Sequence, residues 1–280
     1  MVLSHAHIDH SGNLPTLVKQ GFEGRIYATR ATADLCRLVL PDSAHVQQKD
    51  AEFILKRRSR RKLVGASVPD EPVEPLYTKE DVEQALLLLQ EVAYRGPWEL
   101  GEGLVAEAFD AGHLLGSAAL VIEARRNGRP VRMAFSGDVG RPNLPIIRDP
   151  EPLPPVDYLI IECTYGDRLH KHDEVVLDKL ARVVNRTVER GGRIIVPAFA
   201  VGRTQHLVFL LHQLVEQRRI PSIPIFVDSP LAVNVTEVYR RHTECYDEET
   251  ARYLFDEKDP FGFARLRYVR EVAESKALND

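Results

Sequence analysis

The chain has 280 residues, of which 44% are apolar, and its formal net charge at pH 7 is −4. This length and apolar content suffice for packed cores in two domains, and they exclude a disordered or fibrous protein. The acidic balance excludes a protein that coats nucleic acid through bulk positive charge, so a nucleic-acid substrate would need a local basic groove.

Cysteine usage and hydropathy favour a soluble protein of a reducing compartment. Cys36, Cys163 and Cys245 are odd in number and widely spaced, which predicts neither a disulfide framework nor a thiolate zinc site. Residues 1–20 carry His and Asp where a signal peptide needs an apolar core, and no run approaches the ~20 apolar residues of a membrane helix. We therefore expect a cytoplasmic protein with no membrane partner, and a homo-oligomer stays open.

The first ten residues hold the densest chemistry in the chain, with His5, His7, Asp9 and His10 inside six positions. In an extended strand end, His5 and His7 point to one side, and Asp9 and His10 follow where the chain can turn. Such a run can serve two metal ions. Neutral imidazoles with a carboxylate suit zinc and also admit manganese or iron. The alternative is a surface histidine cluster like a tag, but a tag does not alternate with small and apolar residues.

Strands and helices are expected in alternation after this cluster. Apolar periodicity places helices at 31–40 and at about 78–92, and strands at 24–29, 98–100, 104–109, 118–124 and 131–135. Pro41 is expected to stop the first helix, and Thr78 to cap the second together with Asp81.

A basic run lies between the two helices, with six cations in residues 56–62. Such a patch can steer a polyanion towards the protein. The alternative is a solvated helix face or a loop without a ligand.

Two glycine-bearing loops at strand ends present further ligand types: His113 within residues 110–117 and Asp138 within residues 135–140. Glycines let the backbone approach closely, and strand ends leave side chains free to join a shared site. Taken singly, a lone histidine is more often structural, and an aspartate there is an ordinary turn residue. The order in which both follow the N-terminal cluster is what makes them candidates.

The apolar run at residues 157–162 predicts a buried strand that ends at Glu162 in a polar turn. From residue 168 onward, a helix at 173–190, a strand at 193–199, a helix from Gly202, a strand at 223–227 and a further helix argue for parallel α/β construction. Arg203, Thr204 and Ser229 stand where a strand passes into a helix N-terminus, whose free N–H groups favour a phosphate. The alternative is a tight turn with a surface arginine.

Together these motifs resemble the β-CASP branch of the metallo-β-lactamase family. HxHxDH, GHLLGS and SGD occur in the order of the family's ligand series, and ECTYG, PAFAVGRTQ and DSPLA are similar to β-CASP sequences. Three ligand motifs in the right order are stronger evidence than any one of them. His206 departs from the pattern, which has an acidic residue at that position.

The resemblance implies an α/β fold: a partial metallo-β-lactamase αββα sandwich at residues 1–167, then a partial α/β β-CASP domain at 168–280. It implies strands before residue 1 and two histidine motifs after residue 280, so that the chain would be a fragment. The site it implies puts His5, His7 and His113 on a first metal, Asp9 and His10 on a second, and Asp138 on both. Glu162 would lie behind these ligands and orient a histidine that helps to protonate the leaving group.

The activity implied by the resemblance is hydrolysis of RNA phosphodiester bonds by a hydroxide held between two divalent ions, with zinc favoured. Asp9 and Glu162 are then the catalytic candidates, and Arg203, Thr204 and Ser229 the substrate-binding ones. A DNA substrate and the choice between endo- and exonuclease stay open. So do two other classes: a hydrolase of small esters, thioesters or lactams, and an inactive RNA-binding relative. The first would have no reason to carry the three later motifs, and the visible ligands weigh against the second.

Overall fold

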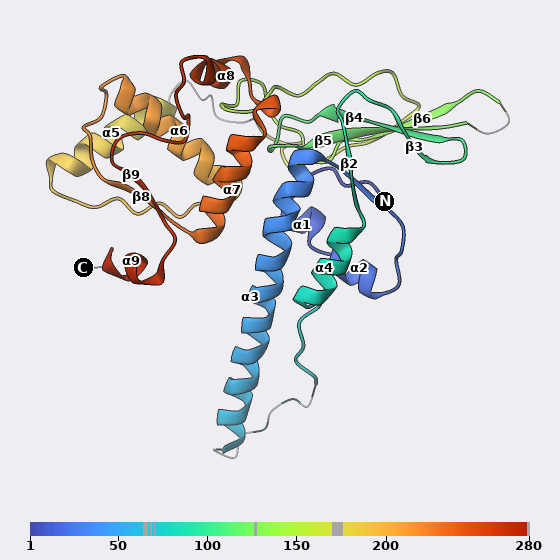
Figure 1. The fold of residues 1–280 in the computed structure, drawn as a ribbon, viewed down its shortest axis with the longest axis horizontal. Helices are drawn as coiled ribbons and strands as arrows, with labels where there is room; N and C mark the ends of the chain where they lie inside the picture. The colour runs from blue at the N-terminus through green and yellow to red at the C-terminus, as the bar shows by residue number, and fades with distance from the viewer. Residues whose placement is uncertain (64–66, 68, 70, 126–127, 170–175, 279–280) are drawn as a thin grey trace.

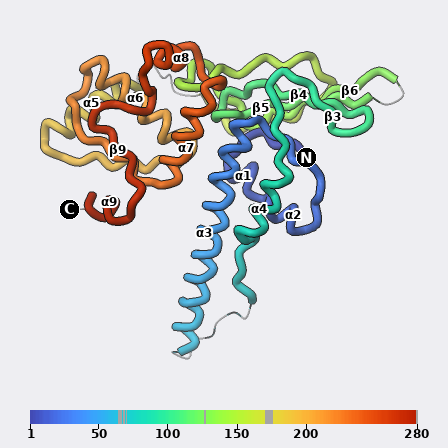
Figure 2. Tube along the Cα trace, in the orientation of Figure 1, coloured from blue at the N-terminus to red at the C-terminus, as the bar shows by residue number. Residues whose placement is uncertain are grey.

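The structure is a computed structural model that describes residues 1–63, 67, 69, 71–125, 128–169 and 176–278. Figure 1 shows a sheet, a long helix that projects away from it, and a second group of helices and strands beside that helix. The tube in Figure 2 follows the same path, with the N-terminus near the sheet and the C-terminus in the second group. The prediction of an α/β fold is confirmed.

The first part of the chain forms a five-stranded sheet, a pair of short strands and the helices around them. The helices are α1 (Ile8–Ser11), α2 (Leu14–Lys19), α3 (Arg30–Leu63) and α4 (Lys79–Leu87). The strands are β1 (Ile26–Thr29), β2 (Leu89–Val92), β3 (Trp98–Gly101), β4 (Leu104–Asp110), β5 (Ala118–Ala124), β6 (Val131–Phe135) and β7 (Tyr158–Ile160). In the large sheet the order is β3-β4-β5-β6-β7, antiparallel except for the parallel pair β6–β7, and β1 pairs in parallel with β2.

The four strands predicted between residues 98 and 135 are confirmed as β3 to β6. The apolar run at 157–162 also forms a strand, β7, but its predicted burial is wrong, since Tyr158 and Leu159 are 64% and 53% exposed. Among the described residues β7 pairs only with β6, so it stands at the edge of the sheet. The apolar composition of an edge strand therefore does not by itself predict that its side chains are buried.

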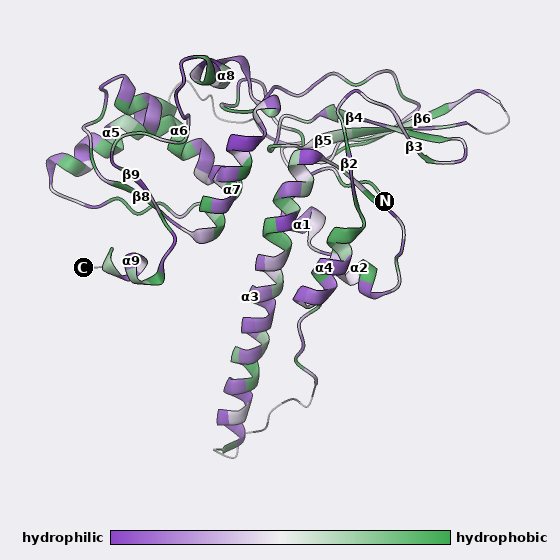
Figure 3. Ribbon diagram, viewed as in Figure 1, coloured by the Kyte–Doolittle hydropathy of each residue, from purple (hydrophilic) through white to green (hydrophobic). Residues whose placement is uncertain are grey.

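Helix α3 continues through Pro41 to Leu63, so the predicted stop at Pro41 is wrong. Proline removes one N–H from the helix ladder and costs about 3 kcal/mol in a helix interior. Burial on both sides of the proline offsets this cost: Leu40 before it and Ala44 after it are at most 2% exposed and belong to one hydrophobic core. Figure 3 shows that the far end of α3 is largely hydrophilic.

Helix α4 begins as predicted and ends earlier. The Thr78 hydroxyl accepts a hydrogen bond from the Asp81 N–H (3.4 Å), and Asp81 Oδ2 accepts one from the Thr78 N–H (2.8 Å), which completes the expected capping box. Residues 89–92 form β2 in place of the predicted last helical turn, with Leu89 opposite Ile26 of β1. Pairing with a distant strand overrides the local helical pattern there.

We expect Thr78→Ala to lower the free energy of unfolding by about 1 kcal/mol, because it removes the hydroxyl that accepts the first-turn N–H of Asp81. Thr78→Ser keeps that acceptor and should leave stability nearly unchanged. Urea unfolding of the three proteins followed by circular dichroism measures the difference. Equal stability of the alanine and serine variants would show that the cap contributes nothing.

The second part of the chain alternates helices with two parallel strands, as the predicted construction requires. Its elements are α5 (Val176–Glu189), α6 (Arg203–Glu216), β8 (Ile225–Asp228), α7 (Pro230–Arg241), the 3-10 turn η2 (Thr243–Cys245), α8 (Glu248–Phe255), β9 (Leu266–Val269) and α9 (Val272–Ala277). The predicted start of the helix at 173 lies outside the described residues. The strand predicted at 193–199 is wrong: it pairs with no described strand, and Ile195 is 91% exposed. An apolar β-branched run forms a ladder only where a partner strand lies beside it.

Helices α3 and α7 join the two parts. One hydrophobic core contains Leu35 of α3 together with Phe209 and Tyr239 from the second part. At the end of α7, His242 contacts Asp34 of α3 through Nε2 (2.9 Å) and Glu244 through Nδ1 (2.7 Å). The boundary at residues 167 and 168 stays a prediction. Each helix in the described ranges is too short or too polar to traverse a lipid bilayer.

Candidate metal centre

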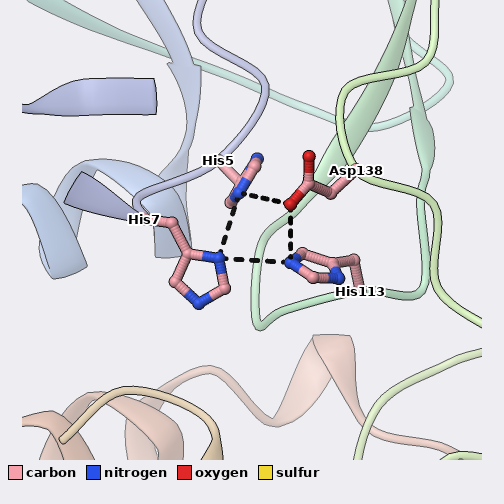
Figure 4. Close-up of side chains that lie close together, drawn as sticks. All are labelled: His5, His7, His113 and Asp138. Carbon is pink, nitrogen blue, oxygen red and sulfur yellow. Dashed lines mark hydrogen bonds and ion pairs between the residues drawn. The ribbon is translucent and has the colours of Figure 1, made fainter. Parts of the chain in front are cut away.

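Four side chains of metal-ligand type from three separate segments meet beside the sheet (Figure 4). His5 and His7 come from the N-terminal segment, His113 from the loop between β4 and β5, and Asp138 from the loop after β6. One ligand atom from each of the four lies within 4.8 Å of the other three. The structure thus brings together residues that are up to 133 positions apart in the sequence.

Four of the six distances between these atoms are close to the ligand spacing around a tetrahedral zinc ion. His7 Nδ1 lies 3.2 Å from His5 Nε2 and 3.1 Å from His113 Nε2. Asp138 Oδ2 lies 3.3 Å from His113 Nε2 and 3.7 Å from His5 Nε2. Ligands about 2.0–2.1 Å from a tetrahedral zinc are separated from one another by about 3.3 Å. Three imidazoles and one carboxylate at this spacing form a donor set for a divalent ion.

A second pair of ligand types lies on the other oxygen of Asp138. His10, in α1, places Nε2 3.2 Å from Asp138 Oδ1 and 3.7 Å from Asp9 Oδ2. The Asp9 side chain is 77% exposed and lies at the rim of the group. The two carboxylate oxygens of Asp138 therefore face two different sets of side chains, the arrangement that a carboxylate shared by two ions requires.

Hydrogen bonds within the loop of His113 hold it against the start of α3. The Ser117 hydroxyl accepts hydrogen bonds from the N–H groups of His113 and of the residue after it, both at 3.1 Å. The hydroxyls of Thr29 and Thr32 both donate to the carbonyl oxygen of Gly116, at 2.6 and 2.8 Å. The three hydroxyls that fix this loop belong to the GHLLGS motif, to the last residue of β1 and to the first turn of α3.

The loops of His113 and Asp138 touch through two glycines. The Gly140 N–H donates to the Ala111 carbonyl (2.8 Å), and a Cβ built on Gly140 would stand 1.6 Å from the carbonyl oxygen of Gly112. Gly112 itself has φ +60°, a conformation that disfavours any side chain. Glycine at both positions is what allows the two ligand loops to approach.

Glu162, beyond the end of β7, is tied to the Asp138 loop. Its Oε1 accepts from the Val139 N–H (2.7 Å), and its own N–H donates to the Ser136 hydroxyl (3.1 Å). Partial burial would raise the pKa of Glu162, but hydrogen bonds from Thr164 and the Val139 amide hold that pKa below its usual value. An ionised Glu162 thus orients the segment that presents Asp138.

His5 is held in the neutral form. Burial, followed by the nearby imidazoles of His10, His7 and His113, lowers the pKa of His5 to about 2. Its Nδ1 lies 3.1 Å from the Ser4 hydroxyl, which leaves Nε2 directed at the cluster. Neutral imidazole is the state that binds a metal ion.

We expect the metal-free protein to lose stability in acid partly through His5. The unfolded chain binds a proton at this residue below pH 6.5, whereas the folded protein does so only near pH 2. Between these values the contribution of His5 falls by about 1.4 kcal/mol for each pH unit of acidification. Comparing chelator-treated parent and His5→Asn in denaturant melts from pH 7 to pH 5 isolates this slope from that of Asp110, whose burial raises its pKa to about 6 and acts oppositely. A constant difference between the two proteins would contradict the expectation.

The cluster opens into a cleft of about 1010 Å³ between the two parts of the chain. His7, Asp9, His113, Asp138 and Glu162 line one side, and Arg203 lines another. His206, which the sequence marked only as a departure, also lines the cleft.

Sequence reasoning missed the wall that α3 contributes. Asp42, Ser43 and Gln47 of that helix face the cleft. Their spacing of one, four and five positions is a helical-face signal, and it was lost because the helix was expected to stop at Pro41.

Two of the predicted substrate-binding residues are used locally and do not line the cleft. The Thr204 hydroxyl donates to the Phe199 carbonyl (2.8 Å), and the Ser229 hydroxyl accepts from the Ala232 N–H (3.2 Å) as the N-cap of α7. Their role in binding substrate stays a prediction, as does that of Arg203.

The fold and the cluster define an α/β protein whose loops gather a histidine and aspartate donor set at one end of a sheet. Residues 204–280 match the family model of the Beta-Casp domain. The whole chain is 35% identical over 280 residues to Ribonuclease TTHA0252 of Thermus thermophilus, 57% of which it covers. Residues 204–280 thus carry a Beta-Casp domain, and the resemblance to β-CASP proteins stated from the motifs is confirmed.

Two more distant relatives also match nearly the whole of this chain. Endoribonuclease YSH1 of Candida glabrata is 28% identical over 98% of this chain and 34% of its own length. Transcription termination factor FttA of Methanocaldococcus jannaschii is 29% identical over 100% of this chain and 41% of its own length. The chain thus spans between about a third and just over half of the relatives it matches.

Proposed function

We propose that the chain is the metal-binding part of a cytoplasmic ribonuclease that hydrolyses phosphodiester bonds in RNA. The observation that carries the proposal is the convergence of His5, His7, His113 and Asp138 within 4.8 Å of one another, with three of the four lining a large cleft. Its support from outside the structure is the similarity over 98–100% of the chain to proteins named ribonuclease and endoribonuclease.

The proposal assigns two divalent ions, with zinc favoured by the imidazole-rich donor set. The first would be held by His5, His7, His113 and Asp138 Oδ2, and the second by Asp9, His10 and Asp138 Oδ1. Divalent ions at such a site acidify water and neutralise charge on a phosphodiester. The low pKa of His5 keeps it ready to bind a metal at neutral pH.

The other residues of the cleft position the substrate and the ligands. Glu162 holds the Val139 amide and so the loop of Asp138. Asp9, exposed at the rim, is in place to contact the substrate or its attacking water. Arg203 supplies a guanidinium across the cleft, a group suited to a phosphate oxygen pair.

The test is metal-dependent cleavage by the chain itself. We would strip the purified protein with a chelator, confirm metal removal by mass spectrometry, and incubate it with end-labelled single-stranded RNA before and after adding back zinc or manganese. The proposal predicts cleavage only with the metal, and a parallel single-stranded DNA measures the preference for RNA. A protein that binds zinc but cleaves small esters and no oligonucleotide would overturn it, and so would cleavage that survives removal of the metal.

A further inference from the structure

The far end of α3 carries positive charge and does not line the cleft. We call residues 56–62 the basic end of α3: Lys56, Arg57, Arg58, Arg60, Arg61 and Lys62, with Ser59 among them. Since the whole chain has a net charge of −4 and this segment holds six cations and no carboxylate, all other residues together sum to −10. The basic end is therefore a concentrated patch of positive charge on a protein that is otherwise acidic.

The basic end stands at a defined distance from the cleft. Gln47 lines the cleft, and it lies on the same helix as the basic end, nine to fifteen positions earlier. At a rise of 1.5 Å per residue, the cations begin about 14 Å and end about 22 Å beyond Gln47 along the helix axis. Figure 1 shows this end projecting from the body of the protein, and its residues are exposed except for the half-buried Arg58.

The helix is braced along this length by the segment that returns to α4. The Gln47 side chain accepts from the Leu76 N–H (3.0 Å), and the Ser43 hydroxyl lies 2.8 Å from the Tyr77 hydroxyl. Further out, the Arg58 guanidinium donates to the Glu71 carbonyl. These contacts fix the basic end relative to the wall of the cleft.

The arrangement of the cations favours a nucleic-acid backbone over a lipid surface. Six charges along about 9 Å of helix are more than enough to match one nucleic-acid strand, which carries one charge per about 3.4 Å. At about 100° per residue the cations spread over roughly 240° of the circumference. The exposed Phe53 and Ile54 lie among the cations on this arc, and only Leu55 and Leu63 fall outside it. A helix that lies on a membrane segregates its apolar and basic residues on opposite faces, and α3 does not.

Local structure does not account for so many cations. One or two positive charges in a last turn are enough to interact favourably with the helix dipole. Within the described ranges, no carboxylate lies at ion-pair distance from Arg57, Arg60 or Arg61. The guanidinium groups of Arg57, Arg60 and Arg61 are thus exposed to solvent on a helix that is braced against its neighbours.

We infer that the basic end of α3 binds the backbone of the RNA strand whose scissile bond lies in the cleft, so that the protein favours strands long enough to reach both. This inference rests on the proposed function. It predicts that the basic end contributes to the affinity for long RNA and contributes nothing to a substrate that is confined to the cleft.

The test compares Arg57→Gln/Arg60→Gln/Arg61→Gln with a matched control, Lys179→Gln/Arg182→Gln/Arg186→Gln, which removes three exposed cations from α5. Glutamine keeps the helix propensity of both sites, and circular dichroism verifies folding. Binding of a fluorescent single-stranded RNA is measured in chelator, where no cleavage occurs, over a range of salt concentrations. We expect the α3 variant to bind about 10-fold more weakly at physiological salt and to lose about 2 from the slope of log K against log salt.

Two results would overturn the inference: unchanged RNA binding by the α3 variant, even if its binding to anionic phospholipid vesicles falls, and an equal loss of RNA binding in the α5 control. Turnover of a dinucleotide should be equal in parent and α3 variant, and a fall there would also count against it. If the parent never cleaves RNA yet its binding depends on the three arginines, the proposed function fails and the binding surface stands. If the parent cleaves RNA and binds it independently of them, only the binding surface fails.

Discussion

Replacing His113 with alanine should lower zinc affinity and RNA cleavage by more than about 100-fold. This imidazole lies within 3.3 Å of both His7 and Asp138, and so it closes the donor set from the side of the sheet. Loss of groups that merely support metal ligands costs about 10- to 100-fold, and loss of a ligand should cost at least as much. Metal content after equilibrium dialysis and the rate of cleavage of labelled RNA measure the two effects.

The control for this variant is His45→Ala, which removes an exposed histidine of α3 that does not line the cleft. It should bind metal and cleave RNA as the parent does. Normal metal content in the His113 variant would show that the four side chains are not a metal site. Normal content with normal cleavage would remove the basis of the proposed function as well.

Replacing Gly140 with alanine should damage the metal site without altering any ligand. The new Cβ would fall 1.6 Å from the Gly112 carbonyl oxygen, so the loops of His113 and Asp138 must move apart. We expect the free energy of unfolding to fall by about 1–3 kcal/mol, as for other overpacked sites. Zinc affinity should fall by about 10- to 100-fold, like that after loss of a supporting contact. Isothermal titration with zinc and urea unfolding measure the two changes.

Gly101→Ala is the matched control, because a Cβ there meets nothing within 4 Å. It should leave metal affinity and stability close to those of the parent. A Gly140 variant that binds zinc as tightly as the parent would mean that the close contact between the two loops does not set the geometry of the site.

Local pattern was sufficient where a residue's role depends on its neighbours in sequence. Apolar residues at 104–109 and 118–124 predicted two strands, and Thr78 with Asp81 predicted a helix start, because both signals act over a few residues. The candidate ligands were also found from short motifs at strand ends. Their meeting within 4.8 Å is a property of the fold, which the order of motifs indicated through resemblance.

Prediction failed where distant contacts decide the outcome. Burial of Leu40 and Ala44 carries α3 across Pro41, and a partner strand turns residues 89–92 from helix into strand. The error at Pro41 had a further effect, since it concealed Asp42, Ser43 and Gln47 as a wall of the cleft. No window of sequence around residue 41 contains the packing partners that outweigh the proline.

The two threonine hydroxyls on the Gly116 carbonyl have a mechanical consequence. They anchor the turn that precedes β5, and with it the imidazole of residue 113, to the root of a rod about 50 Å long. A displacement of this helix would therefore be transmitted to the loop of His113 through two hydrogen bonds. Shortening α3 from its far end should therefore leave the His113 imidazole in place as long as Thr29 and Thr32 are kept.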